Sequence, residues 1–474
     1  MENNQIENNQ IENNRIDRNP MGSMPVGKLL ASTAIPMMVS MLVQALYNIV
    51  DSLYVSQLCE EALNAVSLAF PLQTLMIGFG IGTAVGTNAI LSRYLGAKRY
   101  DDANRSANTG LLLSVLTYLL FAVIGLTFSR TFYALQTDNQ KIVDYGASYS
   151  TICLSLSLGF FIQSTFERML TATGKSYLAM ICQTVGAVTN IVLDPVFIFG
   201  LGPIPRMEVA GAAVATVIGQ FVAGALATVL VLKKVPDVKP EIRKMRWDLP
   251  IVKDIYRIGF PSIVMQCISS VMNFGMNLIL ISFEETATAV FGVYYKLQSF
   301  IFMPVFGLNN GMVPIISYNY GAGKPDRLWK TVKLSMIVSI SIMTVGLIAF
   351  EVIPGPLLSM FNASENMIAI GTKALRIIAI HFPLAGFCII AGSVFQAVGN
   401  PAHSVITSVC RQLLVILPAA WILGRIGGLD AVWFSFPIAE LLSLTLSVIF
   451  MVMTVKIVRQ KMSHGSPVAQ ATEN

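Results

Sequence analysis

Charged residues are scarce in this sequence. Only 12% of its 474 residues are Asp, Glu, Lys or Arg, which is about half of the share that is usual in soluble proteins. Hydrophobic residues make up 54% instead, and apolar stretches of roughly 20 residues, the length of a helix that spans a bilayer, recur along the whole chain. These stretches lack the alternation of a membrane barrel, so we predict a polytopic membrane protein whose spans are helices.

The motifs of common catalytic and nucleotide-binding sites are also missing. Neither a Ser-His-Asp arrangement nor an HExxH motif occurs, so we expect no enzyme. The absence of GxxxxGKS and GxxxxGKT excludes the usual ATP-binding loop. Basic and aromatic residues are not interleaved, so we expect no nucleic-acid partner. The six cysteines show no metal-ligand spacing and lie mostly in apolar runs, so we expect no resident metal and no other cofactor.

The apolar stretches predict an all-α protein with twelve transmembrane helices. Each predicted boundary is good to a few residues. The spans are 29–55, 63–91, 107–129, 145–167, 175–200, 209–232, 255–282, 288–316, 331–353, 372–396, 401–424 and 430–456.

Lysine and arginine are distributed unevenly between the two sets of loops that these spans create. Most of the 32 basic residues lie in one set and in the tails, whereas the opposite loops hold only Arg130, Lys141, Arg206 and Arg425. Cytoplasmic loops carry the excess of basic residues. We therefore predict a protein of the cell (inner or plasma) membrane with both termini in the cytoplasm. Residues 1–27, which include ENNQIENNQIENNRI, form a predicted disordered tail, and residues 458–474 form a second tail.

The chain repeats itself at an offset of 225 positions. Pro36 matches Pro261, and the SRYLGA sequence at 92–97 matches SYNYGA at 317–322. Because the offset contains six spans, both copies start on the same side of the membrane. We predict two parallel six-helix bundles, 28–232 and 255–457, joined by a basic linker at 233–254. This is a transporter architecture, with substrate expected between the bundles near the middle of the membrane.

The two copies differ at three polar positions of the first bundle. The mismatched pairs are Asp51 with Met276, Asn190 with Val415, and Asp194 with Ala419. The second bundle folds without these polar groups. A carboxylate in a membrane span costs about 2.5–3.5 kcal/mol on insertion scales, and such residues are usually functional. The differences therefore indicate a function of the first bundle.

These polar residues fall into two stripes. Asn190 and Asp194 are four apart and share one helix face, and Gln44, Asn48 and Asp51 form the second stripe. Facing each other, the stripes would form a small acidic chamber inside the first bundle. Two carboxylates that lie close together in a poor dielectric do not both ionise easily, so the pair could load and release a proton or hold a sodium ion among oxygen ligands.

Two prolines lie next to this chamber. Pro195 removes a backbone donor beside Asp194, and Pro36 does the same earlier in the first span, so we predict a kink, and a hinge, at each. The structural alternative is that the carboxylates only bond to backbone groups that the prolines leave free.

The chain resembles the multidrug and toxic compound extrusion (MATE) transporters, above all their bacterial multidrug-efflux branch. The resemblance is carried by PVGKLL, LYNIVDSLYV, the pair SRYLGA and SYNYGAGK, TNIVLDPVFIFG and GAAVAT. It implies an antiporter that expels lipophilic, often cationic, compounds against inward proton or sodium flow. The cation-coupling residues that it implies are Asp51, Asn190, Asp194, Thr216, Gln44 and Tyr149, of which the first four could hold sodium.

One feature of related transporters is missing. Another branch of the family has a second cation site in the C-terminal lobe, with acids in its seventh and tenth helices. The corresponding runs, PSIVMQCISSVMNF and FPLAGFCIIAGSVF, contain no acid. The chamber of the first bundle is then the expected coupling site.

The predicted spans also hold other charged residues. Lys296 and Arg411 could snorkel or pair, Glu440 could contact a cationic substrate or pair with one of these cations, and Glu167 with Arg168 is expected to be structural at a cytoplasmic helix end. The residues predicted to line the substrate cavity are Asn48, Met265, Met272, Asn273, Lys296 and Glu440.

Our leading hypothesis is a monomeric secondary transporter that exports small lipophilic or cationic compounds by alternating access, driven by protons or sodium. The first alternative is a lipid-linked oligosaccharide flippase of the same superfamily, which usually has extra spans and a cleft rich in basic residues. The others are an exporter dedicated to one metabolite and an enzyme embedded in the membrane. The sequence leaves the coupling ion and the substrate open.

Overall fold

The computed structural model describes residues 20–200, 205–238, 240, 247–361 and 364–463, and this part of the chain contains helices and no strand. The helices of the N-terminal half are α2 (Pro20–Ser23), α3 (Val26–Ser56), α4 (Glu60–Gly96), α5 (Tyr100–Ala134), α6 (Gln140–Ser155), α7 (Leu158–Ala172), α8 (Ser176–Phe199) and α9 (Glu208–Lys234). Those of the C-terminal half are α10 (Leu249–Ile281), α11 (Glu285–Gly321), α12 (Pro325–Val352), α13 (Pro354–Ser359), α14 (Glu365–Ala379), α15 (Phe382–Ala397), α16 (Pro401–Val409), the π-helix η2 (Cys410–Ile416), α17 (Leu417–Val432) and α18 (Ser435–Ser463).

Among the described residues, 10 helices are long and apolar enough to cross a membrane, or up to 12 spans if each of two bent pairs is one span. This confirms the predicted all-α membrane fold. The bent pairs are α6 with α7, at 44°, and α14 with α15, at 48°. They replace the predicted straight spans 145–167 and 372–396, and their breaks, at 156–157 and 380–381, fall at equivalent positions of the repeat to within one residue.

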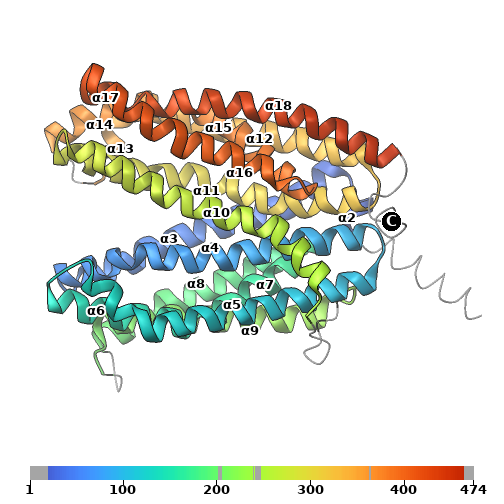
Figure 1. Ribbon diagram of the computed structural model, residues 1–474. Helices are drawn as coiled ribbons and strands as arrows, with labels where there is room; N and C mark the ends of the chain where they lie inside the picture. The colour runs from blue at the N-terminus through green and yellow to red at the C-terminus, as the bar shows by residue number, and fades with distance from the viewer. Residues whose placement is uncertain (1–19, 201–204, 239, 241–246, 362–363, 464–474) are drawn as a thin grey trace, which may run out of the picture.

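The two halves form two lobes that lie side by side. In Figure 1 helices α3 to α9, coloured blue to green, form the N-lobe, and helices α10 to α18, coloured yellow-green to red, form the C-lobe. The lobes meet where α10 packs against α4 and α11 packs against α3. Since α3 and α4 are the first two spans of one copy and α10 and α11 are those of the other, the interface follows the repeat.

The lobes share a hydrophobic core at one end only. We call this the basic end; it is where α3 and α10 begin and α4 and α11 end. Its main core combines residues of both lobes, for example Leu29, Leu170, Met312 and Val398. Towards the opposite end each lobe has its own core. The core of the N-lobe lies around Tyr133, and the core of the C-lobe contains residues of the C-lobe alone. The described structure is therefore closed between the lobes at the basic end.

Glycines allow this close contact between the lobes. A Cβ atom on Gly86 of α4 would lie 2.2 Å from the carbonyl oxygen of Ile255 in α10. At the equivalent place of the repeat, a Cβ on Gly311 of α11 would lie 2.6 Å from the Cα of Ala34 in α3. A side chain at either position would separate the two helix backbones, which only glycine lets approach so closely.

The predicted N-terminal tail 1–27 extends too far at its C-terminal end. Residues 1–19 lie outside the described residues, but Pro20–Ser23 form α2, and Met21 is fully buried in the main core. Arg327 of α12 holds this segment by donating to the carbonyl oxygens of Met21 and Met24 at 3.1 and 2.7 Å. Burial of Met21 and these two bonds outweigh the polar composition of the preceding residues.

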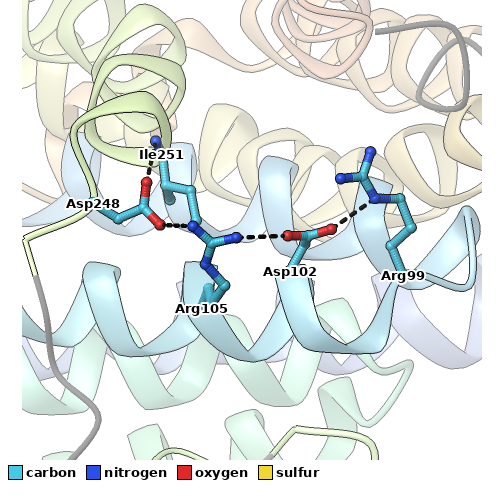
Figure 2. Close-up of polar contacts among 5 residues, drawn as sticks. All are labelled: Arg99, Asp102, Arg105, Asp248 and Ile251. Carbon is cyan, nitrogen blue, oxygen red and sulfur yellow. Dashed lines mark hydrogen bonds and ion pairs between the residues drawn. The ribbon is translucent and has the colours of Figure 1, made fainter. Parts of the chain in front are cut away.

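The linker between the lobes is tied to the N-lobe by a chain of ion pairs (Figure 2). Asp248, just before α10, is the N-cap of that helix, because its Oδ1 accepts a hydrogen bond from the Ile251 amide at 3.4 Å. Its other oxygen pairs with Arg105 of α5, which also contacts Asp102 at 3.2 Å. Helices α9 and α10 reach into the predicted linker 233–254, ending at 234 and starting at 249.

Candidate functional site: a buried polar cluster and its cavity

Four of the predicted coupling residues lie together in the N-lobe. Asn190 of α8 donates from Nδ2 to Asp194 Oδ1 at 3.3 Å and to Thr216 Oγ1 of α9 at 3.2 Å. Asp51 of α3 lies across from them, within hydrogen-bonding reach of the Asp194 carboxyl group. The four-residue spacing in α8 places Asn190 and Asp194 on one face, and the packing of α3 and α9 against α8 completes the cluster.

The cluster is shielded from lipid. The exposed fraction is 8% for Asp51, 2% for Asn190 and 0% for Asp194. Within the described part of the chain, neither carboxylate forms an ion pair with a basic side chain. Three buried oxygens of the cluster, Asp51 Oδ1, Asp194 Oδ2 and Asn190 Oδ1, have no hydrogen-bond partner. Unpartnered buried oxygens are unfavourable, so the cluster is suited to bind a proton or a cation.

Tyrosines surround the carboxyl groups on the inner side. Tyr47, one helix turn before Asp51, lies beside Thr216. Tyr149 of α6 is 4% exposed, and its hydroxyl oxygen accepts a hydrogen bond from Gln73 Nε2 at 3.2 Å. These contacts fix the positions of two hydroxyl groups beside the carboxylates, and such groups can accept a hydrogen bond from a protonated acid or donate one to an ionised acid.

A cavity of about 510 Å³ opens onto this cluster from inside the N-lobe. Asp51, Asn190 and Thr216 line it, as do the predicted residues Gln44, Asn48 and Tyr149. Asp194 lies behind the lining, fully buried. The lining also includes Met37, Met41, Ile77, Phe160, Gln163, Glu167, Arg168 and Gln183.

The two predicted hinges lie inside uninterrupted helices. Pro36 is within α3 and Pro195 is within α8, directly after Asp194. Pro195 has no N–H, so it cannot bond to the carbonyl group one turn earlier, at Ile191. A weakened helical ladder beside the cluster is consistent with a hinge, and the hinge itself stays a prediction about motion.

Five of the predicted substrate-cavity residues lie outside this cavity, in the C-lobe. Met272 is packed into the C-lobe core, and Lys296 is exposed, with its ammonium group over the ring of Phe361. Glu440 is buried and pairs with Arg411 Nη1 at 3.2 Å. Of its two expected roles, contact with a cationic substrate and pairing with a basic residue, the structure shows the second. The remaining two, Met265 and Asn273, are half-buried on α10.

Sequence reasoning missed an acidic residue of the cavity. Glu167 was expected to be structural at a helix end, but α7 continues to Ala172, and Glu167 is buried with its carboxylate in the cavity lining. The repeat held the signal that could have found it. The position equivalent to Glu167 in the second copy is Gly392, so the second lobe folds without this acid as well.

The arrangement offers ion binding rather than covalent chemistry. Over the described residues, no group of three or more His, Cys, Asp or Glu side chains could hold a metal ion. The oxygens of the cluster suit a proton or a hard cation such as sodium, which prefers oxygen ligands. Two parallel lobes with such a cluster inside a membrane domain are typical of secondary transporters.

Comparison with known proteins gives the family. Residues 36–196 and 261–422 each match the family model MatE, and the two matches begin 225 positions apart, as the repeat predicts. Together they cover more than half of the chain. The chain therefore belongs to the MatE family, whose members are membrane transporters and not enzymes.

Relatives and solved structures agree with this assignment. A protein named FAD transporter from Shewanella oneidensis is 26% identical over 420 residues, covering 88% of this chain and 92% of that protein. Multidrug export protein MepA from Staphylococcus haemolyticus is 28% identical over 416 residues, covering 86% and 89%. The solved structure of a MOP superfamily transporter from Pyrococcus furiosus has a TM-score of 0.87 and 25% identity, covering 93% of this chain and 98% of that one.

Proposed function

We propose that the protein is a secondary active multidrug efflux antiporter of the cell membrane, with both termini in the cytoplasm, acting as a monomer and without ATP. It exports lipophilic or cationic compounds in exchange for protons or sodium. The observation that carries this proposal is the buried cluster of Asp51, Asn190 and Asp194, whose unpartnered oxygens lie against a cavity in the N-lobe. The multidrug export activity in the name of the MepA relative supports the substrate class.

The way the lobes pack supports alternating access. The lobes share a core at the basic end, the predicted cytoplasmic side, and have separate cores towards the other end. In this arrangement a substrate would leave outward. Uptake of a proton or sodium ion by the cluster would then bias the lobes towards the opposite arrangement, by as much as the ion's affinity differs between the two states.

A second candidate is an exporter of one metabolite, which the FAD transporter relative favours. FAD carries a negatively charged diphosphate. The described cavity is lined by the carboxylates of Asp51 and Glu167, with Arg168 as a basic residue. An acidic lining disfavours an anion and favours a cation, so we place multidrug export first. The flippase alternative would need a cleft rich in basic residues, which this cavity does not provide.

The test is transport by the purified protein in vesicles, with a proton gradient and a sodium gradient imposed separately. We expect export of ethidium with one of the two gradients, and loss of this gradient dependence in the Asp51→Asn, Asp194→Asn double variant. Gradient-driven export that the double variant retains in full would remove the cluster from the mechanism. Export of FAD but of no cationic dye would favour the second candidate.

A further inference from the structure

A second acidic group lies in the same cavity, closer to the basic end. Glu167 of α7 is 6% exposed. Its Oε1 accepts a hydrogen bond from Gln163 Nε2 at 2.9 Å, and its Oε2 accepts one from Gln183 Nε2 of α8 at 2.8 Å. Two amide donors hold this carboxylate in a fixed position. They do not neutralise it, because both are uncharged.

Arg168 acts on the charge of Glu167 from a distance but forms no ion pair with it. Across the described ranges, no basic side chain forms an ion pair with Glu167. The neighbouring Arg168 instead donates from Nη1 to Asn310 Oδ1 of the C-lobe at 3.0 Å. Gln183 Oε1 is also buried and has no hydrogen-bond partner. The cavity thus holds a fixed carboxylate without an ion-pair partner and an amide oxygen without a hydrogen-bond partner.

The lining of the cavity also includes apolar side chains. Met37, Met41, Phe160 and Ile77 are among its lining residues. Along α8, Gln183 and Asp194 are 11 residues apart, which is roughly 16 Å at 1.5 Å per residue. A lipophilic molecule of drug size could therefore contact Glu167 at one end and extend towards the coupling cluster, with flexible methionine side chains adapting to its shape.

We propose that Glu167, together with the oxygen of Gln183, is the subsite that binds the positively charged group of an organic substrate. This rests on the proposed export function and names the residue that would make it selective for cations. The fold does not require the acid, since the equivalent position in the second lobe is Gly392. A buried carboxylate without an ion-pair partner is costly, and an organic cation bound beside it would offset part of that cost.

The test measures the affinity of two matched probes for the purified full-length protein, with binding monitored by fluorescence. Ethidium carries a quaternised ring nitrogen, and 6-phenylphenanthridine is its uncharged relative. In Glu167→Gln we expect ethidium affinity to fall by about tenfold or more, because the bound cation loses its charged partner in a buried site, with a much smaller change for the neutral probe. Glu167→Asp keeps the charge and should retain most of the ethidium affinity.

Two outcomes would overturn the proposal: unchanged ethidium affinity in Glu167→Gln, and an equal loss for both probes. If unchanged affinity came with loss of proton-driven export, Glu167 would be part of a proton path instead. An unchanged thermal unfolding midpoint shows that each variant is folded. A failure of the proposed function is distinct, because the wild-type protein would then bind neither ethidium nor tetraphenylphosphonium.

Discussion

At the scale of single residues, the repeat acts as an internal control. Asp51, Asn190 and Asp194 could be predicted because the second copy has apolar residues at the equivalent positions. The four-residue spacing within α8 also predicted that Asn190 and Asp194 share one helix face. The contact of Asn190 with Thr216 could not be derived in this way, because it depends on how α8 and α9 pack, and only the resemblance to a family suggested it.

Thr216 can be tested with a substitution of equal shape. Thr216→Val removes the hydroxyl group that accepts the Asn190 hydrogen bond, so Asn190 loses a contact that positions it against Asp194. We expect the driving-ion concentration needed for half-maximal export to rise about tenfold, the effect of losing one buried hydrogen bond. The measurement is the dependence of ethidium export on pH and on sodium.

Thr189→Val is the matched control, since Thr189 is half-buried on the same helix and its hydroxyl donates to the Val185 carbonyl oxygen. If both variants shifted the dependence equally, or if neither did, Thr216 would have no specific part in coupling.

At the scale of helices, the sequence predicted the spans but not their bends. The break at 156–157 contains no proline that would have indicated it. Hydropathy also gave no reason to divide the predicted spans 145–167 and 372–396. Packing supplies one: a Cβ on Gly159, at the start of α7, would lie 2.8 Å from the Phe221 backbone nitrogen of α9. Because the break sets where α7 lies, it also explains why Glu167 was not expected in the cavity.

The start of α10 allows two small contributions to stability to be separated. Asp248→Asn keeps the N-cap oxygen but loses the charge that pairs with Arg105, and an exposed pair of this kind contributes about 0–1 kcal/mol. Asp248→Ala also loses the cap, which costs about 1 kcal/mol. We therefore expect the midpoint of thermal unfolding to fall in the order wild type, Asn variant, Ala variant.

Asp101→Ala is the control for this series, because Asp101 is exposed on the same face of the protein. A drop in Asp101→Ala as large as that in Asp248→Ala would mean that general surface charge, and not the bonds of Asp248, stabilises this end of the molecule.

At the scale of the whole molecule, the two lobes and their parallel relation could be predicted from the repeat. Which end is closed could not, because the same helices can pack at either end and hydropathy is identical in both states. The closed basic end depends on backbone contacts at glycine. A Cβ on Gly96 would lie 2.0 Å from the Tyr318 carbonyl oxygen, and one on Gly321 equally close to that of Arg93, at equivalent positions of the repeat.

Adding one methyl group at the lobe interface should therefore open the basic end. In Gly86→Ala the new Cβ would meet the Ile255 carbonyl oxygen at 2.2 Å, so the closed arrangement becomes strained while each lobe keeps its own core. We expect spin labels at positions 101 and 326, which are both exposed and equivalent in the repeat, to show an added population at longer distance. The labels require a background in which the six native cysteines are replaced by alanine.

The control for this experiment is Gly292→Ala in α11, since a Cβ there meets nothing within 4 Å. The wild type and Gly292→Ala should share one short distance, because nothing in either forces α4 away from α10. A single short distance in Gly86→Ala as well would mean that α4 and α10 absorb the methyl group without separating. Glycine would then not hold the basic end closed, and the rocking of two rigid lobes would lose its structural support. A longer population in Gly86→Ala alone would show that backbone contact between α4 and α10 decides which end is open.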